Sequence, residues 1–140
     1  MTTLPSDPGT ATAPYAPTPM LETDARTVSM LVHIVGAVAA LLSAGTIAFV
    51  APLVMWLAYR DRSALVDHQG KQNINLQLTQ MLVLFAAIVL GIMAFGVGLL
   101  VTIPLWLLYW VYTIAISFIA GLAAQRGEYY AIPFKITFIR

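Results

Sequence analysis

Charged residues and cysteine are both scarce in this sequence. Its 140 residues include no cysteine, and only 9% are Asp, Glu, Lys or Arg, whereas about a quarter of the residues in a soluble domain are charged. Without cysteine the chain has no disulfide framework, no thiolate nucleophile and no cysteine-ligated metal. A net charge of +1 provides no basic surface to hold nucleic acid. A hydrophobic fraction of 60% excludes disorder for most of the chain and predicts a small integral membrane protein.

The few charges are confined to short stretches. No Asp, Glu, Lys or Arg occurs in the 33 residues between Arg26 and Arg60, or in the 54 residues between Lys71 and Arg126. As a single helix, the longer run would measure roughly 80 Å, far more than the ~30 Å hydrocarbon core of a bilayer. We therefore expect this run to fold into two membrane spans.

A break is predicted in the middle of the longer run. Gly96 and Gly98 lower helix stability through their conformational freedom, and Pro104 lacks the amide donor that a helix interior needs. The break from Gly96 through Pro104 separates predicted spans at residues 76–95 and 101–123.

The shorter run is less regular. One helix over all of it would reach roughly 50 Å, too long even for a tilted span. The sequence Ser-Ala-Gly-Thr at residues 43–46 is the best interruption, and it leaves segments 28–42 and 47–59. Each is shorter than the ~20 residues that comfortably cross a bilayer. Two interpretations stay open: two short tilted spans, or a re-entrant hairpin packed inside the protein.

The positions of the basic residues predict the topology. With an even number of segments, every Lys and Arg falls on one side of the membrane, and the connections around Gly45 and Gly98 carry none. By the positive-inside rule this side is cytoplasmic. We therefore predict an all-α integral membrane protein of the bacterial inner membrane, with four hydrophobic segments and both termini in the cytoplasm. The basic residues are Arg26, Arg60, Arg62, Lys71, Arg126, Lys135 and Arg140.

The two ends of the chain differ from the membrane region. Residues 1–26 hold five prolines among Thr, Ala and Ser, which predicts a disordered, partly polyproline-II tail. The predicted bundle occupies residues 27–126. In residues 127–140, Gly127 ends the last helix, and hydrophobic residues then alternate with polar ones. This alternation predicts a short extended segment lying on the lipid headgroups or against the loop after Tyr59.

The third segment is entered through an unusually amide-rich stretch. Helical spacing sorts its polar side chains into two neighbouring stripes. One stripe comprises Gln69, Asn73, Gln77 and Gln80, and the other comprises His68, Gln72, Asn75 and Thr79. A buried amide needs water, another helix or a ligand. The stripes therefore predict either hydrogen bonds between helices or a polar vestibule or docking surface that faces the cytoplasm. Asn73, Asn75, Gln77 and Tyr129 are the residues that we expect to contact a partner or support the structure.

Groups able to carry chemistry are few. His33 and His68 could lie near the same interface, but no complete metal or haem ligand set accompanies them, and a single membrane histidine more often hydrogen-bonds to a neighbouring helix. Neither long run contains a carboxylate for a proton relay, and no hydrolase, phosphate-loop or zinc motif occurs. We therefore expect no enzyme activity, no cofactor and no metal.

Three stretches together resemble a known family. They are residues 52–57 running into Arg60-Asp61, residues 68–79, and residues 126–130 with Ile132-Pro133. In these stretches the chain resembles the small bacterial four-helix membrane proteins of unknown function that are grouped with the Tic-twenty component of chloroplast protein import. The resemblance covers about residues 27–140. It implies four membrane helices and no catalytic residues, and it supplies no activity.

Two functional hypotheses follow. The first is a non-enzymatic inner-membrane protein that packs as an accessory or structural subunit against a larger complex, with a membrane protein or further copies of itself as partner and the lipid bilayer around it. The second is an oligomeric pore or carrier whose mouth is lined by the stripe from Gln69 to Gln80. Four short helices cannot enclose a wide aqueous path, so the second hypothesis requires several copies.

Overall fold

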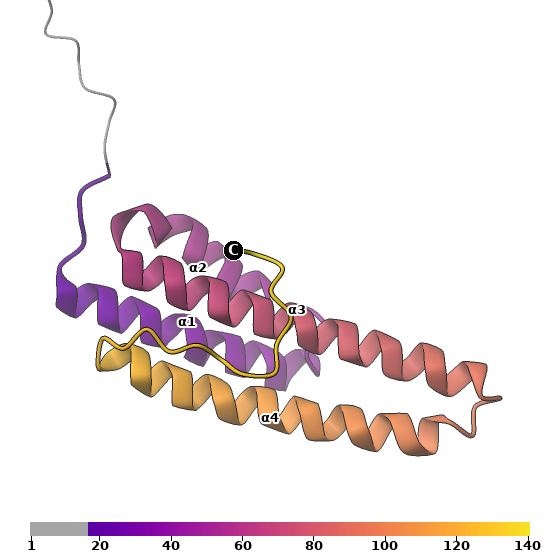
Figure 1. Ribbon diagram of the computed structural model, residues 1–140. Coiled ribbons are helices and arrows are strands. Elements are labelled where there is room, and N and C mark those ends of the chain that lie inside the picture. The colour runs from indigo at the N-terminus through magenta and orange to yellow at the C-terminus, as the bar shows by residue number, and fades with distance from the viewer. Residues whose placement is uncertain (1–16) are drawn as a thin grey trace, which may run out of the picture.

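The computed structural model describes residues 17–140, and within that range all regular structure is helical (Figure 1). Its elements are α1 (Glu22–Ser43), α2 (Val50–Tyr59), the single 3-10 turn η1 (Arg60–Arg62), α3 (Ala64–Met93) and α4 (Leu99–Gln125). The prediction of four helical segments is confirmed. Most of the predicted N-terminal tail lies outside the described residues.

The interruption predicted at residues 43–46 is confirmed. Helix α1 ends at Ser43, and the turn uses left-handed backbone at Ala44 (φ 51°) and Gly45 (φ 81°). Helix α1 begins at Glu22, six residues before the predicted segment, and its first turn carries Glu22 and Asp24, which are favourable at a helix N-terminus. Helix α2 is only ten residues long, or ~15 Å.

Helix α3 starts twelve residues before the predicted span, at Ala64 rather than at residue 76. Ser63 caps it by accepting a hydrogen bond from the backbone N–H of Val66. The amide-rich stretch is thus part of the membrane helix rather than a turn leading into it. The predicted break at the other end is shorter than expected, because Pro104 lies inside α4, and Phe95 (φ 56°) and Gly96 (φ 80°) make the turn.

Three helices are long and apolar enough to cross a membrane: α1, α3 and α4. Helix α2 lies beside α3 and α1 and does not meet that length. The chain is therefore a helical protein with three candidate membrane spans, while the course of α2 and the side on which the termini lie stay predictions.

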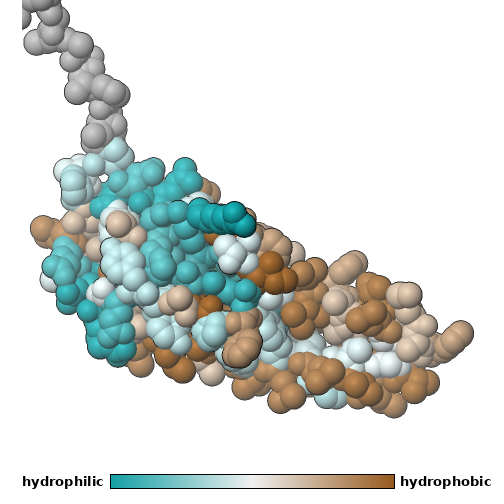
Figure 2. Space-filling view, in the orientation of Figure 1, coloured by the Kyte–Doolittle hydropathy of each residue, from teal (hydrophilic) through white to brown (hydrophobic). Residues whose placement is uncertain are grey.

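The two hairpins reach to different depths. Gly45, in the α1–α2 turn, lies against the side chain of Gln80 on α3. Helix α3 continues for another 13 residues to Met93, about 20 Å further. The α3–α4 hairpin therefore projects alone beyond the α1–α2 turn, and its tip is almost fully exposed, with Phe95 at 98%. Figures 1 and 2 show this projecting end, which is hydrophobic, and the opposite end, where hydrophilic residues gather.

Residues 127–140 form an extended segment without regular structure. In Figure 1 its yellow trace runs back along α4 and then crosses over α3. Ile132 is buried together with Leu76 of α3 and Ile116 and Ala120 of α4 in the hydrophobic core. The predicted alternation does not bury one face of the segment, because Phe134 has a left-handed backbone (φ 51°) that changes the direction of the chain and leaves its ring exposed.

Candidate functional site

The two polar stripes of α3 face different neighbours. We call Gln69, Asn73, Gln77 and Gln80 the inner row and His68, Gln72, Asn75 and Thr79 the outer row. The inner row faces α1 and α4 inside the bundle, and all four side chains are fully buried. The outer row binds the C-terminal segment.

The inner row holds His33 of α1 from both sides of its ring. His33 Nε2 lies 2.9 Å from Gln69 Oε1, and His33 Nδ1 lies 3.0 Å from Asn73 Nδ2. An amide oxygen only accepts and an amide nitrogen only donates, so Nε2 carries the proton and Nδ1 accepts. Both ring nitrogens of neutral His33 are therefore used in binding α1 to α3, and neither is free to ligate a metal.

Close approach of α1 and α3 depends on Gly36. A Cβ added at Gly36 would collide with Oδ1 of Asn73 and lie 3.0 Å from its Cγ. This glycine, one turn beyond His33, allows Asn73 to reach the imidazole. Small residues that let helix backbones approach are a common feature of membrane interfaces.

Several buried amide atoms of the inner row have no partner among the described residues. They are Asn73 Oδ1, Gln80 Nε2 and both polar atoms of the Gln77 amide. Gln80 Oε1 does accept a long hydrogen bond of 3.4 Å from Thr113 of α4. Such atoms raise the free energy of the folded monomer, because hydrocarbon supplies no hydrogen bonds.

The outer row binds the backbone of the C-terminal segment in the way that a neighbouring β-strand would. Gln72 Oε1 accepts from the N–H of Ile132 at 3.0 Å, and Thr79 Oγ1 accepts from that of Ile136 at 2.9 Å. Asn75 makes three bonds of 2.8–2.9 Å: its Oδ1 accepts from the N–H groups of Phe138 and Ile139, and its Nδ2 donates to the carbonyl of Ile139. We call these side chains and the segment that they hold the clasp.

Other side chains complete the clasp. Gln69 Nε2 donates to the carbonyl of Glu128 at 2.6 Å, and His68 Nε2 donates to that of Tyr130 at 3.2 Å. From α4, the hydroxyl of Tyr109 donates to the carbonyl of Phe134 at 2.8 Å, and Tyr112 donates to that of Pro133. A segment without regular secondary structure thus has its polar backbone satisfied by side chains, as a buried backbone requires.

The predicted site residues divide into two groups. The amides Gln69, Asn73, Asn75, Gln77 and Gln80 are buried at 2% exposure or less. Tyr129 is 58% exposed, with its ring edge-on to His68 at 5.2 Å between centroids. Burial of the inner row against α1 and α4 argues against a water-filled vestibule along it. Contact of any of these residues with a partner protein stays a prediction.

Sequence reasoning missed the partner of the outer row. The segment 127–140 was predicted to lie on the lipid headgroups or against the loop after Tyr59, whereas it is bonded to α3 and, through Tyr109 and Tyr112, to α4. One signal was available, since the outer row offers more hydrogen-bonding groups than a helix can satisfy itself.

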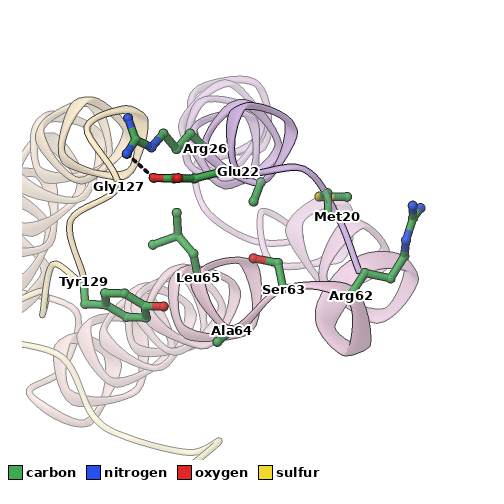
Figure 3. A pocket seen from close by; sticks show the side chains of 10 residues that line it. Met20, Glu22, Arg26, Arg62, Ser63, Ala64, Leu65, Gly127 and Tyr129 are labelled. Carbon is green, nitrogen blue, oxygen red and sulfur yellow. Dashed lines mark hydrogen bonds and ion pairs between the residues drawn. The ribbon is translucent and has the colours of Figure 1, made fainter. Parts of the chain in front are cut away.

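The charged end of the bundle contains a cavity of about 300 Å³ (Figure 3). Its lining includes Glu22 and Arg26, which form an ion pair, together with Leu65 and Tyr129. Arg62 also lines it, and Figure 3 shows this side chain directed away from the Arg26–Glu22 pair. The Glu22–Arg26 pair is neutral as a whole, and the remaining charge, Arg62, is turned away and donates to the carbonyl of Thr18. Within residues 17–140, no three His, Asp or Glu side chains come together as a metal site.

Comparison with known proteins yields one match. No curated protein and no solved structure matches the chain. The model of the MamF/MmsF family, described as the magnetosome magnetite crystal formation protein family, matches residues 24–139. The predicted relation to Tic-twenty proteins is therefore wrong. Two of the three stretches on which it rested, 68–79 and 126–133, are the two sides of the clasp and reflect packing. The match covers the whole membrane region, and the chain belongs to the MamF/MmsF magnetosome protein family.

Proposed function

We propose that this protein is a non-enzymatic subunit of the magnetosome membrane that supports magnetite crystal formation by packing, as a structural or accessory component, with other membrane proteins or further copies of itself. Membership of the family supports the process and the membrane. The structure supports the proposed role in packing against other proteins or further copies.

The observation that carries the proposal is the projecting α3–α4 hairpin. Near its tip, beyond Phe85 on α3 and before Leu105 on α4, the hairpin exposes large apolar side chains on both helices, among them Met93 (73%) and Leu100 (77%). Two helices without further neighbours have less protein contact than the rest of the bundle, and close packing drives helix association in lipid. The hairpin is therefore the surface that we assign to association.

The polar side chains support a structural rather than a catalytic role. His33 is held between Gln69 and Asn73, and the outer row is bonded to the C-terminal backbone. These groups stabilise the tertiary structure, so a reacting group would have to break such bonds to meet a substrate. We place the charged end, with both termini, on the cytoplasmic side of the magnetosome membrane.

Disulfide crosslinking tests the association, because the chain has no cysteine of its own. Ile92→Cys and Leu108→Cys place thiols on the hairpin, and Leu122→Cys places one on α4 beside the bundle, at similar exposures of 61%, 69% and 55%. In magnetosome membranes, we expect a defined crosslinked species at the two hairpin positions and none at Leu122. Monomer alone at all three positions would refute association through the hairpin.

The role in mineral formation is tested separately. In a magnetosome-forming host that lacks its own copy, we expect the full chain to restore magnetite crystal size, measured by electron microscopy. Restoration by a chain in which residues 88–93 and 99–103 are all leucine, with the turn at residues 94–98 unchanged, would contradict a role for specific packing there. Failure of the unaltered chain to change the crystals would refute the function itself.

A further inference from the structure

One face of α3 changes from polar to apolar along a single line. Lys71, Asn75, Leu78, Leu82 and Phe85 follow at alternating spacings of four and three, so they form one stripe along the helix. The change comes just after Asn75, where the end of the C-terminal segment is bonded to α3. The stripe therefore has a cationic end at Lys71 and an apolar end at Phe85 on the same face of α3.

Two cavities follow this stripe, and both lie between α3 and residues 135–140. The first, of about 280 Å³, has a mixed polar and apolar lining that includes Lys71, Lys135 and Arg140, and we call it the basic cavity. The second, of about 340 Å³, is almost entirely apolar and is lined by Leu78, Met81, Leu82, Phe85 and Phe138. Phe138 borders the apolar cavity, while its neighbours Thr137 and Ile139 border the basic cavity. The cavities are thus neighbours across one short stretch of chain.

Basic side chains outnumber acidic ones in the lining of the basic cavity. Lys71 is paired with Asp67 at 2.6 Å. Within residues 17–140, Lys135 and Arg140 form no ion pair, so two cations of the lining are unmatched. Partial burial lowers the pKa of Lys135, and an anion beside it would favour the ammonium form again.

We propose that α3 and residues 135–140 bind one anionic phospholipid, with its phosphate at Lys135 and Arg140 and an acyl chain along Leu78, Leu82 and Phe85. Free phosphate would occupy the basic cavity and leave the apolar cavity empty. A zwitterionic lipid would bring a choline or ethanolamine cation next to two unmatched cations. The site also lies where the hydrophilic surface of the charged end meets the hydrophobic surface of the hairpin (Figure 2). This inference concerns a lipid site and does not depend on the proposed function.

Native mass spectrometry of the detergent-purified full chain tests the charge requirement. With phosphatidylglycerol added, we expect one lipid adduct at concentrations where phosphatidylcholine gives little. Lys135→Gln with Arg140→Gln should weaken phosphatidylglycerol binding by roughly 25-fold, since each basic residue near a membrane surface contributes about a fivefold effect. Arg126→Gln is the control, because this residue is exposed at the same end and paired with Glu128 outside both cavities.

The role of the apolar cavity is tested by filling it with a larger side chain. Leu82→Trp should reduce phosphatidylglycerol binding without changing any charge, whereas Leu108→Trp, on a lipid-facing position of α4, should not. Helix content from circular dichroism identifies any variant that has lost its fold, and the pair at 135 and 140, which lies outside the helices, remains decisive in that case.

Three results would overturn the proposal. Equal binding of phosphatidylcholine would show that the site does not select charge. Competition by glycerol 3-phosphate as effective as that by the whole lipid would assign the site to free phosphate. An equal loss of binding in Arg126→Gln would show that general positive charge, rather than this site, attracts the lipid.

Discussion

At the scale of single residues, Asn75 is the centre of the clasp. Its amide makes three hydrogen bonds to the backbone at Phe138 and Ile139, while Gln72 and Thr79 each make one to other positions of the segment. Helical spacing predicted that Asn75 lies on a polar stripe. It could not identify the partner, because the segment that binds there is more than 60 residues away in sequence and has no periodicity of its own.

Asn75→Ala should release the end of the C-terminal segment. Each hydrogen bond contributes about 1 kcal/mol in water and about 0.6 kcal/mol on average between membrane helices, so the loss of three should speed amide exchange of residues 136–139 by at least about tenfold. Hydrogen exchange measured by mass spectrometry reports this directly. Gln125→Ala, at an exposed amide on the last turn of α4, is the control. Unchanged protection in Asn75→Ala would mean that the clasp is not held by this side chain.

Gly36 tests the contact between α1 and α3, and Gly121 of α4 provides the control. Gly36→Ala places a methyl group against Asn73 and should lower the free energy of unfolding by about 1–3 kcal/mol. Gly121→Ala meets its nearest atom, the Cβ of His33, at 3.4 Å and should be neutral or slightly stabilising, since alanine favours helix. Unfolding in mixed detergent measures both variants. If the two variants unfold alike, the close approach at Gly36 is not what holds α1 against α3.

At the scale of elements, the buried Trp56 is the main polar and aromatic contact of α2 with α3. Trp56 is buried over Gly70, and its indole N–H donates to Asp67 at 2.9 Å. A Cβ added at Gly70 would come within 2.7 Å of Trp56 Cγ. The hydropathy of α2 showed that it is buried or embedded, but the glycine on which it rests is visible only when the two helices are placed together.

Gly70→Ala should displace Trp56 despite the higher helix propensity of alanine. We expect the indole N–H resonance of Trp56 to shift or broaden in an NMR spectrum and stability to fall by about 1–3 kcal/mol. Trp110, whose indole donates to the carbonyl of Ala40 on α1, provides an internal control that should not move. An unchanged Trp56 signal would refute the packing of α2 described here.

Helix boundaries show where local sequence information is insufficient. The interruption at residues 43–46 was predicted, and the structure confirms it with a turn that has positive φ at Ala44 and Gly45. The start of α3 at Ala64 was missed, because Gln and Asn at residues 69–77 suggest an interface when their partners are unknown. Once α1, α4 and the C-terminal segment supply hydrogen bonds, the same amides are compatible with a helix interior.

At the scale of the whole molecule, the two hairpins differ in depth by about 20 Å. This difference motivates a test of the re-entrant interpretation of α1 and α2, because a turn level with Gln80 lies short of the Gly96 turn, whereas α1 by itself is long enough to cross a membrane. Single cysteines at Thr46 and Val97, both exposed in their turns, distinguish the interpretations. We expect Val97→Cys to react with a membrane-impermeant thiol reagent applied from the non-cytoplasmic side and Thr46→Cys to resist it. Equal labelling would mean that both hairpins cross the bilayer fully.

What the sequence alone determined is membership of the membrane class and the gathering of charge at one end. Both follow from the cost of placing ions in hydrocarbon, which depends on composition and order along the chain and not on tertiary contacts. What only the tertiary structure decided is the use of each polar side chain. His33 between two amides, Asn73 against Gly36 and Asn75 on the C-terminal backbone are contacts between residues far apart in the chain. Hydrogen bonds need donor and acceptor within about 3 Å, and that proximity exists only after the helices have packed.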